Sequence, residues 1–370
     1  MFQVHRQADP GPVGSYRVVW FKRDLRLHDH AALAQAAAHG PVLCLFILEP
    51  SLWAQPDAAA QHLGFVQESL LDLRQALRRL GGELHVAVGE AVDVLNRLYT
   101  LASFEALHAH EETGNAHTYA RDLAVGKWCK AHGVGWHEVP QFGVVRRLGN
   151  RNQWQRRWEA HMAQPMATLP ELWFAAAPRQ GLGTAPDPLR LHATAFGLNP
   201  RQPPARQRGG RTRGLAVLND FLAHRSQRYR GGISSPLSAP SACSRLSAHL
   251  ALGTLSLREV VQATRARMAA LADPYQRAGL SAFSSRLYWH CHFIQKLESE
   301  PELEWRNLHR GYDGLREPGW NLAHFEALSQ GRTGWPMVDA CVAMLRHTGW
   351  LNFRMRAMLV SVAAYPLWLH

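Results

Sequence analysis

Two hydrophobic periods alternate along the first 145 residues. Short apolar runs rich in β-branched and aromatic residues are typical of buried strands, whereas apolar residues three or four positions apart are typical of amphipathic helices. The strand-type runs lie at 16–21, 41–48, 83–88, 104–108 and 134–139. The helical stretches between them lie at 30–38, 61–80, 90–101 and 116–132. This alternation predicts a parallel sheet with helices on both faces, whose ligands would lie at the carboxyl ends of the strands.

The pattern changes twice further along the chain. Pro, Gly, Gln and Arg accumulate up to residue 213, which predicts a long linker with one helix at 152–162. Beyond it no strand pattern remains, and an all-α domain is predicted. Its helical stretches lie at 214–225, 244–250, 256–271, 282–297, 323–328, 338–347 and 352–369. The expected organisation is a polar, disordered lead (1–15), an α/β domain (16–145), a linker (146–213) and a helical domain (214–370).

The length and the cysteine usage limit the class of protein. A chain of 370 residues can bury two cores, and it contains no run of eighteen apolar residues, so no membrane span is expected. The five cysteines are scattered, their number is odd, and none form a C-x-x-C pair. We therefore expect a reduced, cytoplasmic monomer without a zinc or iron–sulfur site.

The charge balance indicates an anionic partner. Lys and Arg number 41 against 29 Asp and Glu, which gives a net charge of +12, and only four of the basic residues are Lys. Arginine binds phosphate bidentately and stacks on bases, so nucleic acid is one candidate partner. The abundance of Ala leaves codon bias as an alternative explanation of the arginine content.

The first predicted strand runs directly into a charged segment, WFKRDLRLHD at 20–29. Asp29 would cap the following helix, and the charges could simply form a salt-bridged loop. The chain contains no G-x-G-x-x-G or Walker A motif, so a dinucleotide or triphosphate site of the usual kind is not expected.

Four segments of the second half carry candidate chemistry. The hydroxyls of SACSRLS (241–247) could hold a phosphate at a helix start, or only cap that helix. In RLYWHCHF (286–293) Trp289 and Phe293 are i, i+4 neighbours, as in a ligand platform or a core stripe. GRTGWPMVDA (331–340) predicts a rigid turn into a helix. TGWLNFRMR (348–356) places Arg354 and Arg356 in an apolar helix that we expect to be largely buried, which would require an anion or carboxylate partner.

Together these segments resemble the DNA photolyase/cryptochrome family. The family patterns are W-F-R-R-D-L-R-L-x-D-N, T-S-x-L-S, E-L-x-W-R-E-F-Y, G-x-T-G-x-P-x-V-D-A and G-W-x-H-N-R-x-R-M, and the likeness extends from Val18 to His370. It implies a Rossmann-like antenna domain, a wrapping linker and a helical FAD-binding domain. It also implies FAD as cofactor, a possible antenna chromophore of unknown identity, and DNA containing pyrimidine dimers as partner.

The resemblance assigns roles residue by residue. The residues implied to contact the FAD are Tyr229, Cys243, Ser244, Arg245, Leu246, Ser247 and Arg356. Those implied to contact DNA are Arg286, Trp289, Phe293, Phe353 and Arg354. Trp289 and Trp350 would stack on the lesion, and Trp320 would be the outer member of an electron-transfer chain. Residues 108–112 lie where relatives contact the antenna chromophore.

This sequence departs from the family pattern at several positions. Arg286 replaces a Glu that accepts hydrogen bonds from the lesion, which an arginine cannot do. Cys243 replaces the common Thr, and Phe353 replaces an Asn. The family's later helical stretch, with an Asp beside the flavin and the inner tryptophans, is expected to be missing. The resemblance implies a light-dependent repair lyase, and the alternatives are a cryptochrome-like photoreceptor and a non-catalytic DNA-binding remnant.

Overall fold

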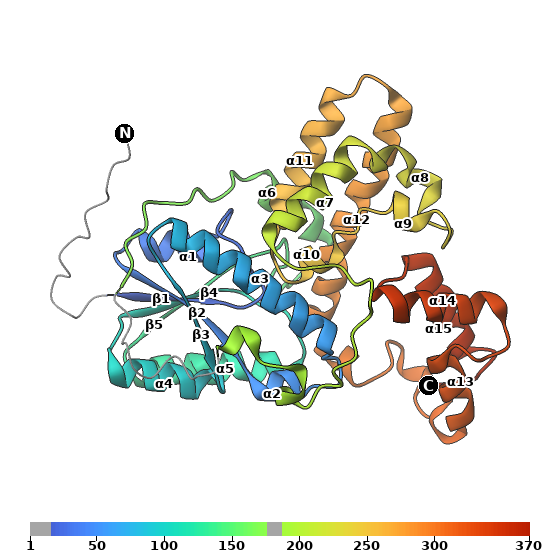
Figure 1. Cartoon of the computed structure of the whole chain (residues 1–370), viewed down its shortest axis with the longest axis horizontal. Coiled ribbons are helices and arrows are strands. Elements are labelled where there is room, and N and C mark those ends of the chain that lie inside the picture. Colours follow the sequence, from blue (N-terminus) through green and yellow to red (C-terminus); the bar gives the residue numbers. More distant parts are fainter. Residues whose placement is uncertain (1–15, 176–186) are drawn as a thin grey trace.

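The first domain is a parallel sheet between two layers of helices (Figure 1). The computed structural model describes residues 16–175 and 187–370, so the predicted lead, 1–15, lies outside the described residues. The five strands are β1 (Arg17–Phe21), β2 (Val42–Leu48), β3 (Leu84–Val88), β4 (Ala106–His110) and β5 (Gly135–Val139). Their order is β3-β2-β1-β4-β5 and every pair is parallel, so the predicted α/β architecture is confirmed.

Alternation along each strand divides the core into two apolar layers. In β1, Val19 and Phe21 pack toward α1 and α3, while Val18 and Trp20 pack toward α4 and α5. Both faces of the sheet are covered, which is why the strands read as nearly continuous apolar runs. The covering helices are α1 (Ala31–Ala37), α3 (Ala60–Arg79), α4 (Ala91–Leu101) and α5 (Ala116–Ala131). These match the predicted helices to within one residue at most ends.

In this domain the sequence analysis missed one helix and assigned one helix cap to the wrong residue. The short helix α2 (Pro50–Trp53) was not predicted, because four residues are too few to show a helical period. His30, rather than Asp29, caps α1: its Nδ1 accepts the Leu33 N–H at 3.0 Å. Asp29 instead has a left-handed backbone (φ 50°), and its carboxylate accepts the N–H of Ala167 and the hydroxyl of Ser256.

The helical domain follows the linker, and the linker itself contains the predicted helix as α6 (Trp154–Ala163). The further helices are α7 (Arg211–Ala223), α8 (Tyr229–Gly232), α9 (Ala239–Ala242), α10 (Ser247–Ala251), α11 (Leu257–Ala270) and α12 (Pro274–Ser299). Short 3-10 turns separate several of them. A third core joins Trp154 and Trp158 of α6 to Phe221, Phe283 and Leu287. The four-residue helices α8 and α9 were not predicted.

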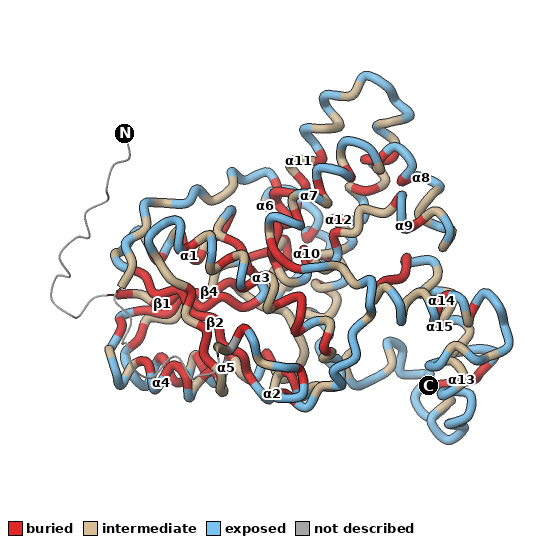
Figure 2. The backbone as a smooth tube through the Cα atoms, viewed as in Figure 1, coloured by how far each residue is buried: buried red, intermediate tan, exposed pale blue. Residues whose placement is uncertain are grey.

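The last three helices form a more exposed part of the molecule, drawn in red in Figure 1. They are α13 (Leu322–Gln330), α14 (Pro336–Thr348) and α15 (Phe353–Ala364). Among the described residues, α13 and α15 contain none that is buried, and Figure 2 shows mostly exposed backbone there. The expected burial of the helix carrying Arg354 and Arg356 was therefore wrong. Arg354 and Arg356 are both exposed, and neither forms an ion pair with a carboxylate of the described residues.

The two domains meet at the β1–α1 loop. The guanidinium of Arg26 is buried and donates to the carbonyl of Gly253 at 2.9 Å, and Leu25 N–H donates to Leu252 O at 3.2 Å. Gly253 has φ 62°, and a Cβ at this position would lie 2.1 Å from the carbonyl oxygen of Arg23. Only glycine permits both this backbone conformation and this approach.

The end of the linker packs along α3 and then meets the C-terminal helices. Gly209 and Gly210 donate their N–H groups to Glu68 and Ser69 of α3 at 2.7 and 3.0 Å. Ala205 N–H donates to the carbonyl of His347, at the end of α14, at 2.9 Å. The end of the linker therefore contacts both α3 of the first domain and the end of α14.

The remaining sequence predictions concern membranes and cysteines. In the described ranges, no helix has the length and apolar content needed to cross a membrane. All five cysteines are free thiols, as their spacing predicted.

Candidate cofactor and DNA-binding site

Apart from Arg356, which lies on α15, the predicted FAD contacts lie between the end of α7 and the first residue of α10. Tyr229 begins α8, and its buried ring packs edge-on against Phe221 and Phe283, with centroids 5.6 Å apart in both pairs. Burial, followed by the nearby Cys243, raises the pKa of the Tyr229 hydroxyl, so the hydroxyl keeps its proton at neutral pH.

Residues 243–247, here called the phosphate-site segment, leave polar groups unused. The carbonyl of Cys243 accepts from Arg225, and Leu246 is buried as the N-cap of α10. The hydroxyls of Ser244 and Ser247 make no hydrogen bond within residues 16–175 and 187–370. Arg245 has a left-handed backbone (φ 61°) and no acidic partner in that same part of the chain. Unused hydroxyls next to an unpaired guanidinium fit an anionic group such as a pyrophosphate.

Two contacts hold the C-terminal motif against this region. The guanidinium carbon of Arg245 lies 4.0 Å from the centroid of the Trp350 ring, and Trp350 is 9% exposed. Asn352 is buried, and its Nδ2 donates to the carbonyls of Ile233 and Ser234 at 3.0 and 3.2 Å. The sequence indicated no such anchoring role for Asn352.

The aromatic pair on α12 faces solvent and is not part of a core. Trp289 and Phe293 are 41% and 56% exposed, and their rings meet edge-on at 6.1 Å, as the i, i+4 spacing predicted. Arg286 lies over the Trp289 ring at 4.5 Å. The same helix carries Phe283, whose ring packs against Tyr229 with centroids 5.6 Å apart, so α12 contacts one of the predicted FAD residues.

The remaining predicted residues lie on the C-terminal helices. Phe353 and Arg354 are exposed at the start of α15, and the Arg356 Nε donates to the carbonyl of Leu351 at 2.9 Å. Trp320 is 48% exposed and packs against Phe325 at 5.3 Å, close to α13. Its ring contact is therefore within the exposed C-terminal part and not with the phosphate-site segment.

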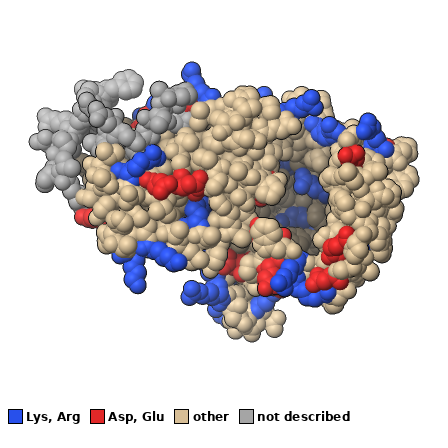
Figure 3. All heavy atoms as spheres, turned by 90° about the horizontal axis from the view of Figure 1, so that it is seen from below, with Lys and Arg blue, Asp and Glu red and all other residues tan. Residues whose placement is uncertain are grey.

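A cavity of about 470 Å³ lies between the two domains, and we call it the interdomain cavity. The sheet side contributes aromatic residues at or after the ends of β1 and β2, among them Trp20, Phe46 and Trp53. The helical side contributes Ser247, Trp350 and Arg356, which were predicted to serve the flavin or the lesion. Trp350 therefore faces Arg245 of the phosphate-site segment and also lines this cavity. The molecular surface in Figure 3 is deeply hollowed, and basic side chains lie inside the hollow.

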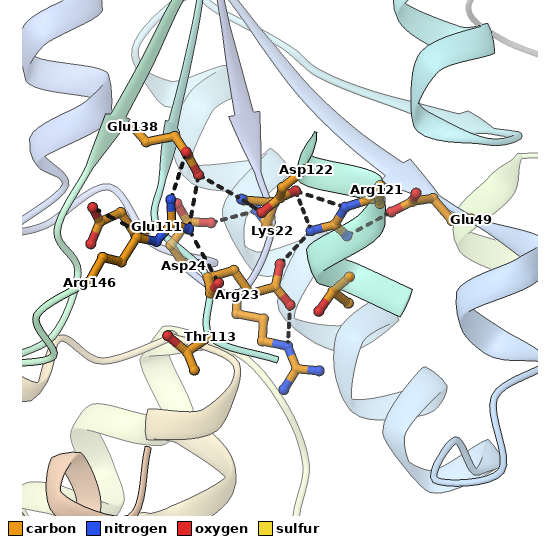
Figure 4. A network of polar contacts seen from close by, with 12 residues as sticks. Lys22, Arg23, Asp24, Glu49, Glu111, Thr113, Arg121, Asp122, Glu138 and Arg146 are labelled. Carbon is orange, nitrogen blue, oxygen red and sulfur yellow. Dashed lines mark hydrogen bonds and ion pairs between the residues drawn. The ribbon is translucent and has the colours of Figure 1, made fainter. Parts of the chain in front are cut away.

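A buried charge network borders the cavity (Figure 4). Arg121 of α5 donates to Glu49 at 3.0 Å, to Glu112 at 2.7 Å and to Asp122 at 3.0 Å. Burial would lower the pKa of Arg121, but these three carboxylates raise it overall. Burial likewise would raise the pKa of Glu112, yet Arg121, Arg23 and Lys22 hold it at about 2.

Another buried cluster occupies the point where the sheet order changes direction, between β1 and β4. Asp24 Oδ2 lies 2.7 Å from His110 Nδ1 and 3.0 Å from His30 Nε2, and all three side chains are buried. These residue types are possible metal ligands. However, His30 Nδ1 accepts the Leu33 N–H, so a neutral His30 carries its proton on the Nε2 that faces Asp24. The cluster is accordingly assigned as a carboxylate between two imidazole N–H groups.

The sequence did not reveal the cavity or Glu49. Glu49 follows a fully buried strand directly, at the sheet edge where ligands bind, and this position is the one signal that could have identified it. The other cavity walls come from separate segments that only the fold brings together.

The parallel sheet and the helical domain define a two-domain protein, and Arg245 beside the free hydroxyls of Ser244 and Ser247 makes a candidate site for an anionic group. Comparison with known families agrees with this class. The sequence pattern of the family described as DNA photolyase matches residues 17–147, and that of the FAD binding domain of DNA photolyase matches residues 283–370. The chain belongs to the DNA photolyase/cryptochrome family.

The similar proteins include both branches of this family. A deoxyribodipyrimidine photo-lyase of Streptomyces griseus is 28% identical over 370 residues, covering 96% of this chain and 76% of the relative. Cryptochrome-2 of Gallus gallus is also 28% identical, covering 97% of this chain and 64% of the relative. The crystal structure of an archaeal photolyase from Sulfolobus tokodaii with two FAD molecules superposes with a TM-score of 0.73 at 25% identity, covering 94% of this chain and 74% of that one. Identity at this level does not separate photolyase from cryptochrome.

Proposed function

We propose that this protein is a light-dependent DNA repair flavoprotein that splits pyrimidine dimers. The observation that carries the proposal is the phosphate-site segment, where Arg245 has no acidic partner and the hydroxyls of Ser244 and Ser247 make no hydrogen bond in the described chain. Tyr229, another predicted FAD contact, packs against Phe283 of α12, the helix that also carries the exposed Trp289 and Phe293. A cofactor site next to an aromatic platform is the arrangement that this chemistry needs.

The FAD would be held chiefly by its phosphates. Arg245 would supply the charge, and Ser244 and Ser247 would supply hydroxyl donors. Burial raises the pKa of the Cys243 thiol to about 11, so the thiol stays neutral at pH 7 and is only a weak donor. Arg356 would brace the flavin from the C-terminal side. Reduced FAD, once bound and excited by light, supplies the electron that splits the dimer.

DNA would meet the protein on the exposed face of α12 and the start of α15. Trp289 and Phe293 offer flat apolar surfaces for unstacked bases, and Arg286 and Arg354 offer unpaired guanidinium groups for phosphates. Trp350 would contact the lesion, and Trp320 would relay electrons to the surface. The net charge of +12 would strengthen DNA binding at low salt.

The interdomain cavity would hold a second, light-harvesting chromophore. Its volume falls in the range of small-molecule sites, and aromatic side chains form much of its wall. The archaeal relative is described as holding two FAD molecules, with the implication of a novel light-harvesting cofactor. That precedent supports a second chromophore here.

One observation favours a photoreceptor instead. Arg286 stands where the family resemblance places a lesion-binding Glu, and its guanidinium covers the Trp289 ring at 4.5 Å. A lesion base would have to displace this guanidinium before it could stack on that face of Trp289. A blue-light sensor without repair activity has no such requirement.

Two measurements separate these functions. The purified chain, incubated with FAD and passed over a desalting column, should retain flavin absorbance; a colourless protein would reject both light-driven functions and leave a DNA-binding remnant. The flavin-loaded protein is then reduced and illuminated with an oligonucleotide containing a cyclobutane dimer. Restored thymines in light but not in darkness establish the lyase, and flavin photochemistry without repair establishes the sensor.

A further inference from the structure

Helix α5 carries apolar residues on both of its sides. Val125, Trp128 and Cys129 are buried on the side that packs against the sheet. The exposed apolar residues of the other side follow the spacing i, i+3, i+4, i+7 and i+8 and are Ala116, Tyr119, Ala120, Leu123 and Ala124. Tyr119 and Leu123 are 62% and 50% exposed. A surface helix ordinarily presents polar residues to solvent, so this outer side, here called the α5 face, has the composition of a surface that another element covers.

The two ends of the α5 face carry opposite charges. Lys127 and Lys130 are exposed near the end of the helix, and neither forms an ion pair within residues 16–175 and 187–370. At the first residue of the helix, the carboxylate of Glu304 accepts the Ala116 N–H at 2.6 Å, and Glu304 has no cationic partner in those same ranges. Four of the seven residues at 298–304 are Glu. The face is therefore acidic where the helix begins and basic where it ends.

An exposed aromatic residue borders the acidic end. Trp305 directly follows Glu304 in the chain and is 71% exposed. Because Glu304 contacts the start of α5, this part of the helical domain lies at the edge of the α5 face. The apolar surface available to a partner thus extends from Tyr119 and Leu123 toward Trp305.

We propose that the α5 face binds the same face of a second copy of this chain, with the two α5 helices packed antiparallel about a twofold axis near Tyr119 and Leu123. In a twofold dimer every contact occurs twice, so Lys127 and Lys130 of each copy would meet Glu304 of the other. A parallel arrangement would instead bring like charges together. A partner with charge of one sign would match only one end of the face, whereas a second copy matches both.

The alanines make such packing possible. Ala116, Ala120 and Ala124 leave room for two helix backbones to approach closely, and Tyr119 and Leu123 of each copy can fill the space beside them. The 16 residues of α5 give a contact about 24 Å long. One helix from each copy buries less than a full-sized interface, so we expect a reversible dimer with a dissociation constant on the order of 10 µM.

Sedimentation velocity of the purified chain at low salt tests the dimer over a concentration series. In Leu123→Glu, two carboxylates would oppose each other near the twofold axis, so the dissociation constant should rise at least about tenfold. Leu71→Glu is the matched control, because Leu71 lies on α3 and is 46% exposed, and this variant should dimerise like the unaltered chain. An unaltered chain that stays monomeric would overturn the second copy as the occupant and leave the face to a different partner. A Leu123→Glu variant that dimerises normally would overturn the α5 face as the interface.

Reversing the charges at each end tests the antiparallel arrangement. One variant combines Lys127→Glu with Lys130→Glu, and the other combines Glu302→Lys with Glu304→Lys. Each variant alone should be monomeric, because like charges would meet at both ends of the dimer. An equimolar mixture of the two should form a heterodimer, because opposite charges then meet at both ends. Thermal unfolding verifies that each variant is folded, and a mixture of folded variants that stays monomeric would contradict the proposal.

Discussion

Arg245 and Trp350 form a stacked pair across more than a hundred residues of sequence, with the guanidinium carbon 4.0 Å from the ring centroid. The pair joins the phosphate-site segment to the C-terminal motif, and its Trp350 lines the interdomain cavity. We expect a double-mutant cycle of Arg245→Leu and Trp350→Leu to give a coupling of about 0.5–2 kcal/mol, measured by urea unfolding. Arg228→Leu, an exposed arginine outside the pair, should show no coupling to Trp350→Leu.

Cys243→Thr should raise the affinity for FAD. The substitution adds a hydroxyl donor where the chain now has a thiol whose pKa burial raises to about 11. One additional hydrogen bond to a phosphate is worth about 1.5–3 kcal/mol, so the dissociation constant should fall roughly tenfold or more. Equilibrium dialysis against FAD measures this change. A Cys243→Val variant, which has the shape of Thr without the hydroxyl, should bind no more tightly than the unaltered chain.

Arg286→Ala should weaken DNA binding mainly through charge. Arg286 has no acidic partner in the described ranges and lies beside exposed Trp289. If it meets a phosphate, the slope of log affinity against log salt should decrease in magnitude by about one, similarly for damaged and undamaged DNA. Fluorescence anisotropy across a salt series tests this. Arg286→Lys should keep the salt slope, and a slope unchanged in Arg286→Ala would place the residue outside the DNA contact.

Acid should destabilise the fold through the Asp24 cluster. Burial and the neighbouring His30 lower the pKa of His110 to about 3, although Asp24 opposes the shift. An unfolded histidine binds its proton near pH 6.5, so this stabilisation is complete above about pH 6.5 and is lost progressively toward pH 3. Burial would raise the pKa of Asp24, but His30 and His110 hold it well below its usual range, so its contribution is lost in the same direction.

The measurement is the free energy of unfolding in urea between pH 7.5 and pH 4.5. His110→Asn removes one titrating group. In this variant the free energy of unfolding should therefore fall less steeply as the pH is lowered, by at most about 1.4 kcal/mol per pH unit. His39→Asn changes an exposed histidine and should leave the decline as it is in the unaltered chain. A decline equally steep in both variants would assign the acid sensitivity to other groups.

Gly253→Ala should be strongly destabilising. The added methyl group would lie 2.1 Å from the carbonyl oxygen of Arg23, at a backbone φ of 62°. Gly133→Ala is a close control, because Gly133 has φ 67° and no atom within 4 Å of the added carbon. The control should cost about 1 kcal/mol from backbone strain alone, and Gly253→Ala about 3 kcal/mol or more, measured by thermal unfolding. A similar loss of stability in both variants would mean that the backbone of Arg23 can move to accommodate the added methyl group.

The sequence predicted the sheet well because both faces of it are buried. Strand β2 is buried at every position, and β1 to β4 are each followed by at least one helix. The helices α2, α8 and α9 were missed because four residues do not establish a period. The expected burial of Arg354 and Arg356 was inferred from the apolar composition of their helix, and composition alone does not say whether another element packs against it.

The site could be predicted only where it is continuous in sequence. Segment 243–247 could be predicted as a phosphate contact or a helix cap because its hydroxyls are adjacent in sequence, and the phosphate role remains a prediction. The interdomain cavity combines residues as distant as Trp20 and Arg356, which no local pattern connects. No role was predicted for Asn352, yet in the fold it anchors the C-terminal motif to the carbonyls of Ile233 and Ser234.

The hydrogen bond between Ala205 and His347 brings together two positions that are far apart in the sequence, one before the helical domain and one near its end. The linker contacts α3 on one side and the end of α14 on the other. Residues 206–346, which include most of the helical domain, therefore lie between two positions that are hydrogen-bonded to each other. A single peptide-bond break among these residues, for example in the exposed turn between α11 and α12, would leave one fragment with α3 and the linker and a second fragment with α14, and these elements would still contact each other. The molecule is thus topologically suited to fragment complementation, with two separately expressed pieces reassembling around residues 205–210.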